Sequence, residues 1–371
     1  MFRAPLKTHY FCYKNHYLCG NKYFNLMKRF KRHRDYGFWD QDIRLSKLSQ
    51  LGDPLEKLNN GVDFEIFRSF LEDNLTKEPQ GKGGRPPYDY VLMFKILILQ
   101  RYYNLSDDQA EYQINDRMSF MRFLNLTISD DIPDSKTVWH FRERLTDFDL
   151  VEDLFSLFFR ELEKLGLIVN QGKIIDASFV EVPRGRNSRE ENKQIKNGET
   201  PERFEANPHI KSQKDLDARW TKKNKISYYG YKNHVKQDSV SKLIVTYCVT
   251  SASVHDSQKT DMLLTDKDKD QPLYADSAYS GEPQEKIITK KEMINQVCEK
   301  GVRNSPLTEK QKESNREKSR IRSRVEHIFG FMENSMNGMY IECIGIKRAT
   351  AVIGLMNLTY NMFRKVQLMQ I

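Results

Sequence analysis

A charged side chain in the middle of an apolar strand is the feature that most constrains this chain. Residues 173–182 are rich in β-branched and aromatic side chains and lie between Gly172 and Pro183, which predicts a buried strand. Asp176 stands within it. An ionised aspartate is costly to bury unless it is paired or binds a metal, although near a strand end it can instead face solvent or cap the following turn. Asp176 therefore needs a partner or a route to water.

A second segment repeats this pattern 100 positions later, from 176 to 276. Residues 272–281 run as an apolar strand into Asp276, and small residues and a glycine follow. Each of the two strands delivers one carboxylate. We therefore expect Asp176 and Asp276 to share one site.

A long helix is predicted after residue 308, where Thr308 and Gln311 form a capping pattern. Apolar side chains then recur at helical spacing and define one buried face: Ile321, Val325, Ile328 and Met332. Glu326 lies at the border of this face, on one stripe with Arg322. A pair at this spacing is usually a surface salt bridge. Beside two aspartates, the glutamate would instead be a third metal ligand.

Three carboxylates from two strands and a helix suit phosphoryl chemistry with Mg²⁺. Asp176, Asp276 and Glu326 would supply the oxygen ligands that hard divalent ions prefer, and Mg²⁺ keeps water and phosphate in its shell. Two such ions about 4 Å apart activate an attacking hydroxyl and stabilise the leaving oxygen. The sequence therefore predicts two Mg²⁺ ions, which Mn²⁺ can replace.

The net charge of +9 indicates a polyanionic partner such as nucleic acid, if the charge is clustered. The five cysteines are odd in number and lack CxxC spacing, so we expect a reduced cytosolic protein without a zinc site or disulfide framework. The most apolar run, residues 90–99, is too short to span a bilayer and is interrupted by Lys95, so we expect no membrane association.

The patterning divides the chain into segments. Residues 1–26 show no periodicity and no signal-peptide core, and we expect a disordered leader that is not part of the fold, with Met27 as the natural start. The pattern is helical up to about residue 165 and changes to strands near Asn170. Residues 27–168 are therefore predicted to form a helical DNA-binding domain.

The remainder is predicted to be an α/β catalytic domain over residues 169–340. It contains a polar stretch at about 184–225 with little periodicity, which we interpret as an insertion or flexible loop. A last helix within residues 341–371 either packs back on the core or forms a dimer contact. His255 follows a strand and either lies close to the metal site or caps a helix.

Basic segments are candidates for DNA contact. Residues 220–236 contain no acid and interleave lysines with aromatic residues, as nucleic-acid surfaces do; the alternative is a cross-strand tyrosine pair with solvated lysines. Residues 136–145 suit a helix-turn-helix-like reader, unless Trp139 and its apolar neighbours are core. The predicted contacts are Lys222, Lys223, Lys225, Tyr231, Lys232, His234, Arg320, Arg322, Arg324, Lys136 and Arg142.

Five motifs together carry a family resemblance: residues 174–178, 229–234, 254–257, 273–279 and 324–330. With them the chain resembles the DDE transposases of bacterial insertion sequences, the group named after insertion sequence five. The resemblance implies an RNase H-like core, a mixed sheet with flanking helices, preceded by an all-α domain. A related signature places tyrosine, arginine, glutamate and lysine on the glutamate helix. Arg322 fits its arginine, but Ser319 and Glu333 stand at the tyrosine and lysine positions.

The resemblance also implies a function and partners. A transposase of this kind binds the terminal inverted repeats of its own element, hydrolyses the element's ends with Mg²⁺, and directs the freed 3′-hydroxyl at target DNA. Asp176, Asp276 and Glu326 become the catalytic metal ligands, and the protein acts in the bacterial cytoplasm, at the nucleoid, as a homodimer or higher oligomer on DNA. Two alternatives stay open: a two-metal nuclease without strand transfer, and a non-catalytic DNA-binding relic of a transposase.

Overall fold

The computed structural model describes residues 37–76, 86–223, 225–301 and 305–370. The predicted leader, residues 1–26, and the predicted start at Met27 lie outside these ranges. The chain divides into two compact units, Met1–Leu51 and Gly52–Ile371. In the first, α2 (Asp40–Gln50) carries two acidic residues in its first turn, where they complement the helix dipole, and has no buried residue.

The second unit begins with helices whose ends match their capping residues. Asp89 caps α5, Ser106 and Gln109 form the predicted capping box of α6, and Asp134 caps α8. The helix α5 is buried over most of its length, as expected for the most apolar run of the sequence. The elements are α3 (Pro54–Gly61), η1 (Phe64–Phe67), α4 (Arg68–Leu75), α5 (Tyr90–Tyr103), α6 (Asp107–Asp116), α7 (Met118–Leu124), α8 (Ser135–Asp147) and α9 (Leu150–Lys164).

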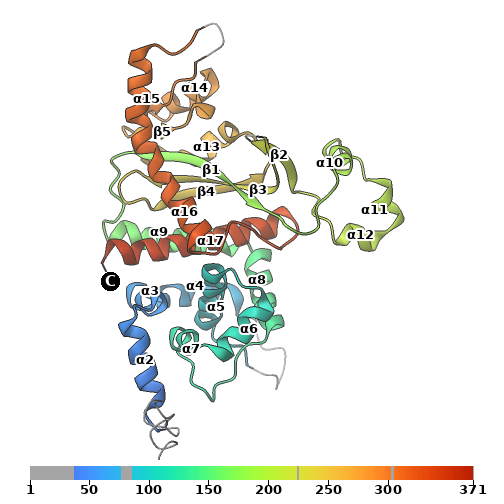
Figure 1. The fold of residues 1–371 in the computed structure, drawn as a ribbon, viewed down its shortest axis with the longest axis vertical. Helices are drawn as coiled ribbons and strands as arrows, with labels where there is room; N and C mark the ends of the chain where they lie inside the picture. The colour runs from blue at the N-terminus through green and yellow to red at the C-terminus, as the bar shows by residue number, and fades with distance from the viewer. Residues whose placement is uncertain (1–36, 77–85, 224, 302–304, 371) are drawn as a thin grey trace, which may run out of the picture. The chain divides into compact units, whose positions relative to one another are not determined.

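In the part of the chain that the structure describes, six strands form one mixed sheet (Figure 1). The order is β2-β3-β1-β5-β6, with β4 also paired to β3. The long strand β3 runs antiparallel to β1, β2 and β4, whereas β1, β5 and β6 are parallel. The strands are β1 (Lys173–Glu181), β2 (Arg219–Lys223), β3 (Ile226–Asp238), β4 (Ile244–Ser251), β5 (Pro272–Ala275) and β6 (Ile294–Val297). The prediction of an α/β fold, with a mixed sheet and flanking helices behind an all-α region, is confirmed.

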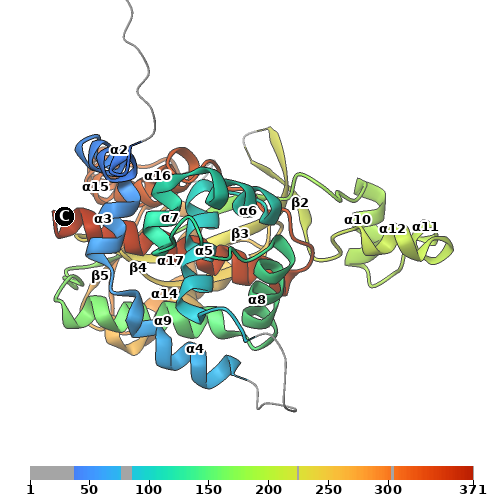
Figure 2. The ribbon, with the colours of Figure 1, turned by 90° about the horizontal axis from the view of Figure 1, so that it is seen from below.

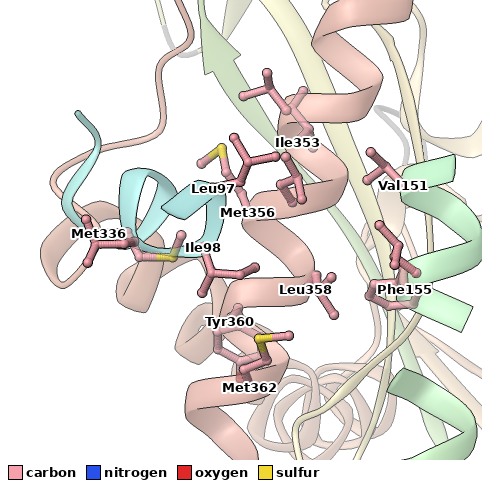
Figure 3. Packing of buried hydrophobic residues seen from close by; sticks show 14 of the residues in the cluster. Leu97, Ile98, Val151, Phe155, Met336, Ile353, Met356, Leu358, Tyr360 and Met362 are labelled. Carbon is pink, nitrogen blue, oxygen red and sulfur yellow. The ribbon is translucent and has the colours of Figure 1, made fainter. Parts of the chain in front are cut away.

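The last helix, α17 (Ile346–Leu368), is buried over almost its whole length. Figure 3 shows side chains of α5, among them Leu97 and Ile98, on one side of α17 and Val151 and Phe155 of α9 on the other. On the sheet, Asn361 of α17 accepts a hydrogen bond from the Ile244 backbone N–H at 2.9 Å and donates one back to its carbonyl. The helix therefore joins the helical region and the sheet in one continuous core.

The remaining elements connect the strands and cover the sheet. They are η2 (Asp256–Lys259), α13 (Thr260–Leu263), η3 (Asp266–Asp268), η4 (Ser277–Tyr279), α14 (Glu282–Lys290), α15 (Glu309–Arg322), η5 (Ser323–Val325) and α16 (Glu326–Asn334). Within the described residues, every helix is too short or too polar to cross a bilayer.

The polar stretch after β1 forms three short helices beside the sheet, visible as a lobe in Figures 1 and 2. They are α10 (Arg189–Lys196), α11 (Glu202–Ala206) and α12 (Pro208–Ser212). The interpretation as a loop missed them because they are short, although Ser188 and Glu191 form a capping box. Asp215 is fully buried and accepts hydrogen bonds from the Tyr231 hydroxyl and the Ala218 N–H, which ties the end of the lobe to β3.

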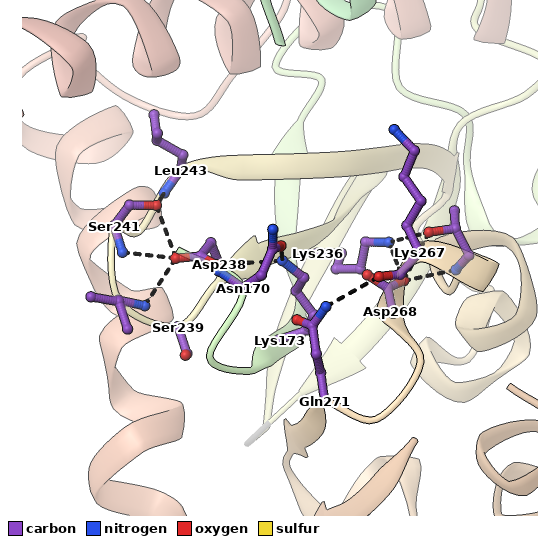
Figure 4. Close-up of polar contacts among 12 residues, drawn as sticks. Asn170, Lys173, Lys236, Asp238, Ser239, Ser241, Leu243, Lys267, Asp268 and Gln271 are labelled. Carbon is purple, nitrogen blue, oxygen red and sulfur yellow. Dashed lines mark hydrogen bonds and ion pairs between the residues drawn. The ribbon is translucent and has the colours of Figure 1, made fainter. Parts of the chain in front are cut away.

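Two buried ion pairs hold β1 and β3 in place (Figure 4). Lys173 lies 3.4 Å from Asp238, and Lys236 lies 2.6 Å from Asp268, with all four side chains almost inaccessible to water. Burial would raise the pKa of Asp238, but the Ser241 N–H and the Lys173 charge hold it below its usual value. These lysines are therefore structural.

Candidate active site

The two predicted aspartates lie on neighbouring parallel strands. β1 and β5 pair with Lys173 opposite Leu273 and Ile174 opposite Tyr274, the same offset of 100 positions that separates Asp176 from Asp276. Asp176 comes two residues after Ile174, and Asp276 comes two residues after Tyr274, the last two residues that are paired. Because side chains alternate along a strand, Asp176 shares the face of Ile174 and Asp276 that of Tyr274. The sheet therefore brings both carboxylates to one face, with Asp176 inside β1 and Asp276 directly after the end of β5.

The environment of Asp176 opposes its ionisation. Burial raises its pKa to about 6, and the charge of Asp276 acts in the same direction. The Ala177 N–H, which donates to Asp176 Oδ1 at 2.8 Å, and the charge of Arg322 act against that rise. Asp276 Oδ1 accepts from the Ala278 N–H at 2.8 Å and so caps the turn that follows β5. The negative charges of Asp176 and Asp276 are thus only partly neutralised, and an additional positive charge nearby would stabilise the ionised carboxylates.

Arg322 places a positive charge beside Asp176. Its guanidinium Nη1 lies 3.1 Å from Asp176 Oδ2, and the two side chains are 25% and 15% exposed. The sequence predicted Arg322 as a DNA contact and did not predict this pair. Its partner is 146 positions away, a separation at which no helical or strand periodicity carries a signal.

Glu326 lies outside this cluster. The helix that was predicted to run through residues 315–332 is interrupted, because the 3₁₀ turn η5 separates Arg322, at the end of α15, from Glu326, at the start of α16. A 3₁₀ helix turns by roughly 120° per residue against roughly 100° in an α-helix, so three residues add roughly 60° of rotation. Glu326 is therefore rotated further from Arg322 than in a continuous α-helix, and its side chain is exposed. Its role as the third ligand stays a prediction.

The donors present fit a hard divalent ion in part. Asp176 and Asp276 offer carboxylate oxygens of the kind that Mg²⁺ prefers, and one of them already binds a cationic side chain. Over the described ranges, no three His, Cys, Asp or Glu side chains converge closely enough to hold a metal. Two of the three predicted ligands therefore lie on neighbouring strands, and a metal site that also includes Glu326 stays a prediction.

Several predicted DNA contacts are exposed. Lys222 and Lys223 end β2, and Lys225 begins the turn to β3. The Lys223 charge lowers the pKa of Asp176, a smaller effect than the burial that raises it, so this lysine lies near the carboxylates. Other exposed members of the predicted set are Arg320, Arg324 and, on α8, Lys136.

Three other predicted contacts are inside the fold, which corrects their assignment as DNA contacts. Tyr231 donates to Asp215, Lys232 binds Asp256 at 2.7 Å, and His234 is hydrogen-bonded to a threonine hydroxyl on β4. All three side chains are buried, on a strand that pairs with β1 on one side and β4 on the other. The alternating basic and aromatic pattern could not distinguish this central strand from an exposed one.

Two further residues have local roles. Arg142 forms a two-pronged ion pair with Asp107, at 2.6 and 2.8 Å, that joins α8 to α6. A DNA contact by Arg142 stays a prediction. His255 caps η2 by accepting from the Ser257 N–H, which is the second of the two roles predicted for it.

Comparisons with known proteins agree with this geometry. Residues 43–144 match the family model described as a transposase domain, DUF772. Residues 169–362, more than half of the chain, match the model of the transposase DDE domain. The chain belongs to the transposase DDE domain family. It is therefore an enzyme of the DDE transposase type, as predicted, while membership of the group named after insertion sequence five stays a prediction.

A solved structure is also similar to this transposase. It is the cryo-EM structure of the piggyBac transposase synaptic complex with hairpin DNA, with 14% sequence identity and a TM-score of 0.43. The match covers 85% of this chain and 75% of that chain.

Proposed function

We propose that this transposase binds the terminal inverted repeats of its own insertion sequence, cleaves the DNA there with a divalent metal ion, and joins the freed 3′-hydroxyl to target DNA. The observation that carries the proposal is the pair of aspartates, Asp176 and Asp276, on adjoining parallel strands of a chain in the DDE family. Burial and the neighbouring charge of Asp276 raise the pKa of Asp176, so a bound cation would favour its ionised form.

The chain's own residues have defined roles in this proposal. Asp176, Asp276 and Glu326 would hold Mg²⁺ ions, which when bound stabilise charge on the attacking and leaving oxygens. In the first reaction, a water oxygen bonds to the phosphorus at the element's end, and the 3′ oxygen leaves and takes up a proton. In the second, that 3′-hydroxyl loses its proton as its oxygen bonds to a phosphorus of the target DNA, and the target strand's own 3′ oxygen leaves that phosphorus and takes up a proton. The phosphodiester bonds are exchanged without an external energy source.

Exposed basic residues support a path for the DNA backbone beside the carboxylates. The lysines of the turn between β2 and β3 lie on one side, and Arg320 and Arg324 lie on α15 and the η5 turn. On α8, exposed Lys136 and His140 accompany Trp139, which is 41% exposed and available for a contact with DNA. Contacts of this kind bind phosphates without reading the base sequence.

The reaction also implies an assembly. Joining both ends of an element to one target requires two active sites held together, so we propose a homodimer or higher oligomer on DNA. The free protein need not be an oligomer.

The test is an end-cleavage and strand-transfer assay with the DNA that flanks this gene, in Mg²⁺ or Mn²⁺. We expect cutting and joining at a repeat end by the wild type and neither reaction by Asp276→Asn. Cutting without joining would identify the nuclease alternative. Binding without metal-dependent cutting by either protein would identify a DNA-binding relic.

A further inference from the structure

We propose that the cleft between the helices α5, α6 and α8 and residues 340–348 binds a phosphate group of the DNA backbone, and that Arg101 holds this phosphate. The inference rests on the proposed function, because it adds a DNA contact to the transposase. Asp176 and Asp276 do not line this cleft. Neither the sequence motifs nor the family matches assign a role to it.

The cleft is large enough for a ligand. Its volume is about 640 Å³, which is within the range of ligand sites in proteins. One wall comes from the helical region, with Arg101 of α5, Ser106 at the start of α6 and Trp139 of α8. The other wall includes Tyr340 and the residues that lead into α17. A ligand here would therefore contact both the helical region and the segment before the last helix.

Most of the charged side chains in the cleft already have partners. Three of its arginines each form an ion pair with a carboxylate: Arg142 with Asp107, Arg348 with Glu143, and Arg184 with Glu342. Arg101 is different, because within the described ranges it forms no ion pair. Asp108 also lines the cleft, but its side chain is exposed and solvated. Arg101 is therefore a cation of the cleft that is available to a ligand.

The guanidinium of Arg101 uses little of its hydrogen-bonding capacity. Its Nη2 donates to the Leu105 carbonyl at 3.4 Å, which is long for a hydrogen bond. A guanidinium carries several more N–H donors in a planar fork. Burial lowers the pKa of Arg101 to about 10, and the charge of Arg142 acts in the same direction. An anion in the cleft would accept hydrogen bonds from the remaining N–H groups and reduce the repulsion between the two guanidiniums.

The neighbours of Arg101 favour DNA as the source of this anion. The planar fork of arginine matches two oxygens of a phosphate. Trp139 lines the same cleft and is 41% exposed, so its ring can contact a sugar or base while Arg101 binds the phosphate. Exposed Lys136 lies about one turn earlier on α8, and exposed His140 packs beside the Trp139 ring. DNA that lies along α8 would therefore reach the mouth of the cleft.

The test measures binding of a labelled DNA duplex to the full-length protein by fluorescence anisotropy, in EDTA and over a series of salt concentrations. Arg101→Gln is expected to lower the affinity about tenfold, the effect of one lost hydrogen bond to a charged group. It should also reduce the slope of log affinity against log salt by about 0.9, the value for one phosphate contact. An affinity and slope equal to those of the wild type would overturn the proposal.

Arg160→Gln is the matched control. Arg160 is exposed on α9 and does not line the cleft, and like Arg101 it donates a 3.4 Å bond to a backbone carbonyl four residues away. It removes the same charge from the protein and is expected to leave the affinity and the slope unchanged. Equal losses in the two variants would show a general effect of net charge and would contradict a site at Arg101.

A second variant guards against loss of the fold. Arg101→Lys keeps the charge but loses the planar fork, so it is expected to keep the salt slope of the wild type at a lower affinity. Should Arg101→Gln not fold, this separation of slope and affinity supports the proposal. An affinity of Arg101→Lys equal to that of the wild type would then count against recognition by the fork.

A parallel measurement separates DNA from free phosphate. The Tm of each protein is measured without DNA in inorganic phosphate and in chloride of equal ionic strength, because a ligand of the folded state raises Tm. If Arg101→Gln abolishes a phosphate-dependent rise but binds DNA as the wild type does, the cleft serves free phosphate and the proposal is wrong. The DNA assay contains EDTA and needs no particular base sequence. Failure of end cleavage or of repeat recognition would therefore refute the proposed function without changing this result.

Discussion

Replacement of Asp176 by asparagine is expected to stabilise the metal-free transposase at pH 8. The carboxyl has a usual pKa of 3.8 and a folded-state pKa of about 6, mainly because of burial. Each pH unit between these values corresponds to about 1.4 kcal/mol, so ionised Asp176 costs the folded state about 3 kcal/mol. Asparagine keeps the shape of the side chain and removes this cost.

The sign of the pH dependence follows from the raised pKa. Below about pH 4 the carboxyl is protonated in both states and carries no penalty. The penalty grows as the pH rises to about 6 and is constant above that value. Arg322 loses its partner in the variant, but its side chain is 25% exposed and can reach water. We therefore expect a net gain of about 2 kcal/mol at pH 8 and almost none at pH 4.

The assay is urea unfolding in EDTA at both pH values, with Asp261→Asn, at an exposed position, as the control. A gain at pH 8 that disappears at pH 4 would support the reasoning. Addition of Mg²⁺ should then stabilise the wild type but not the variant, since ligand binding to the folded state adds to stability. Destabilisation by Asp176→Asn at pH 8 in EDTA would refute the stated electrostatic cost.

Three further predictions use other parts of the structure. Lys236→Met leaves Asp268 buried without its cation and should lower the free energy of unfolding by about 3–5 kcal/mol, measured in urea. Gly230→Ala places a Cβ against the Val180 carbonyl at a φ of +151° and should destabilise the pairing of β1 with β3, seen as loss of a cooperative unfolding transition at 37 °C. Lys223→Gln should reduce the slope of log affinity for DNA against log salt by about 0.9, the value for one lost phosphate contact. An unchanged slope would place Lys223 away from the DNA.

The exposure of the side chains along β3 could not be predicted from the sequence. Lysines and aromatics alternate along residues 220–236, and the pattern is the same whether the strand is an edge or lies between two others. Only the exposed part at Lys222, Lys223 and Lys225 suits DNA, because the side chains of β3 are buried from Tyr229 onward. Burial of Lys236 could not be predicted either, since its partner Asp268 lies on a different element.

The sequence alone determined the elements that carry the chemistry. An apolar, β-branched run contains Asp176, a second apolar run ends at Asp276, and capping residues mark the helix before Glu326, because local periodicity and capping depend on neighbours in the chain. Only the tertiary structure decided which side chains meet. Arg322 reaches Asp176 because α15 packs beside β5 and the η5 turn packs beside β1, and Glu326 follows that turn at the start of α16. Such pairings depend on strand order and helix position, which no local pattern encodes.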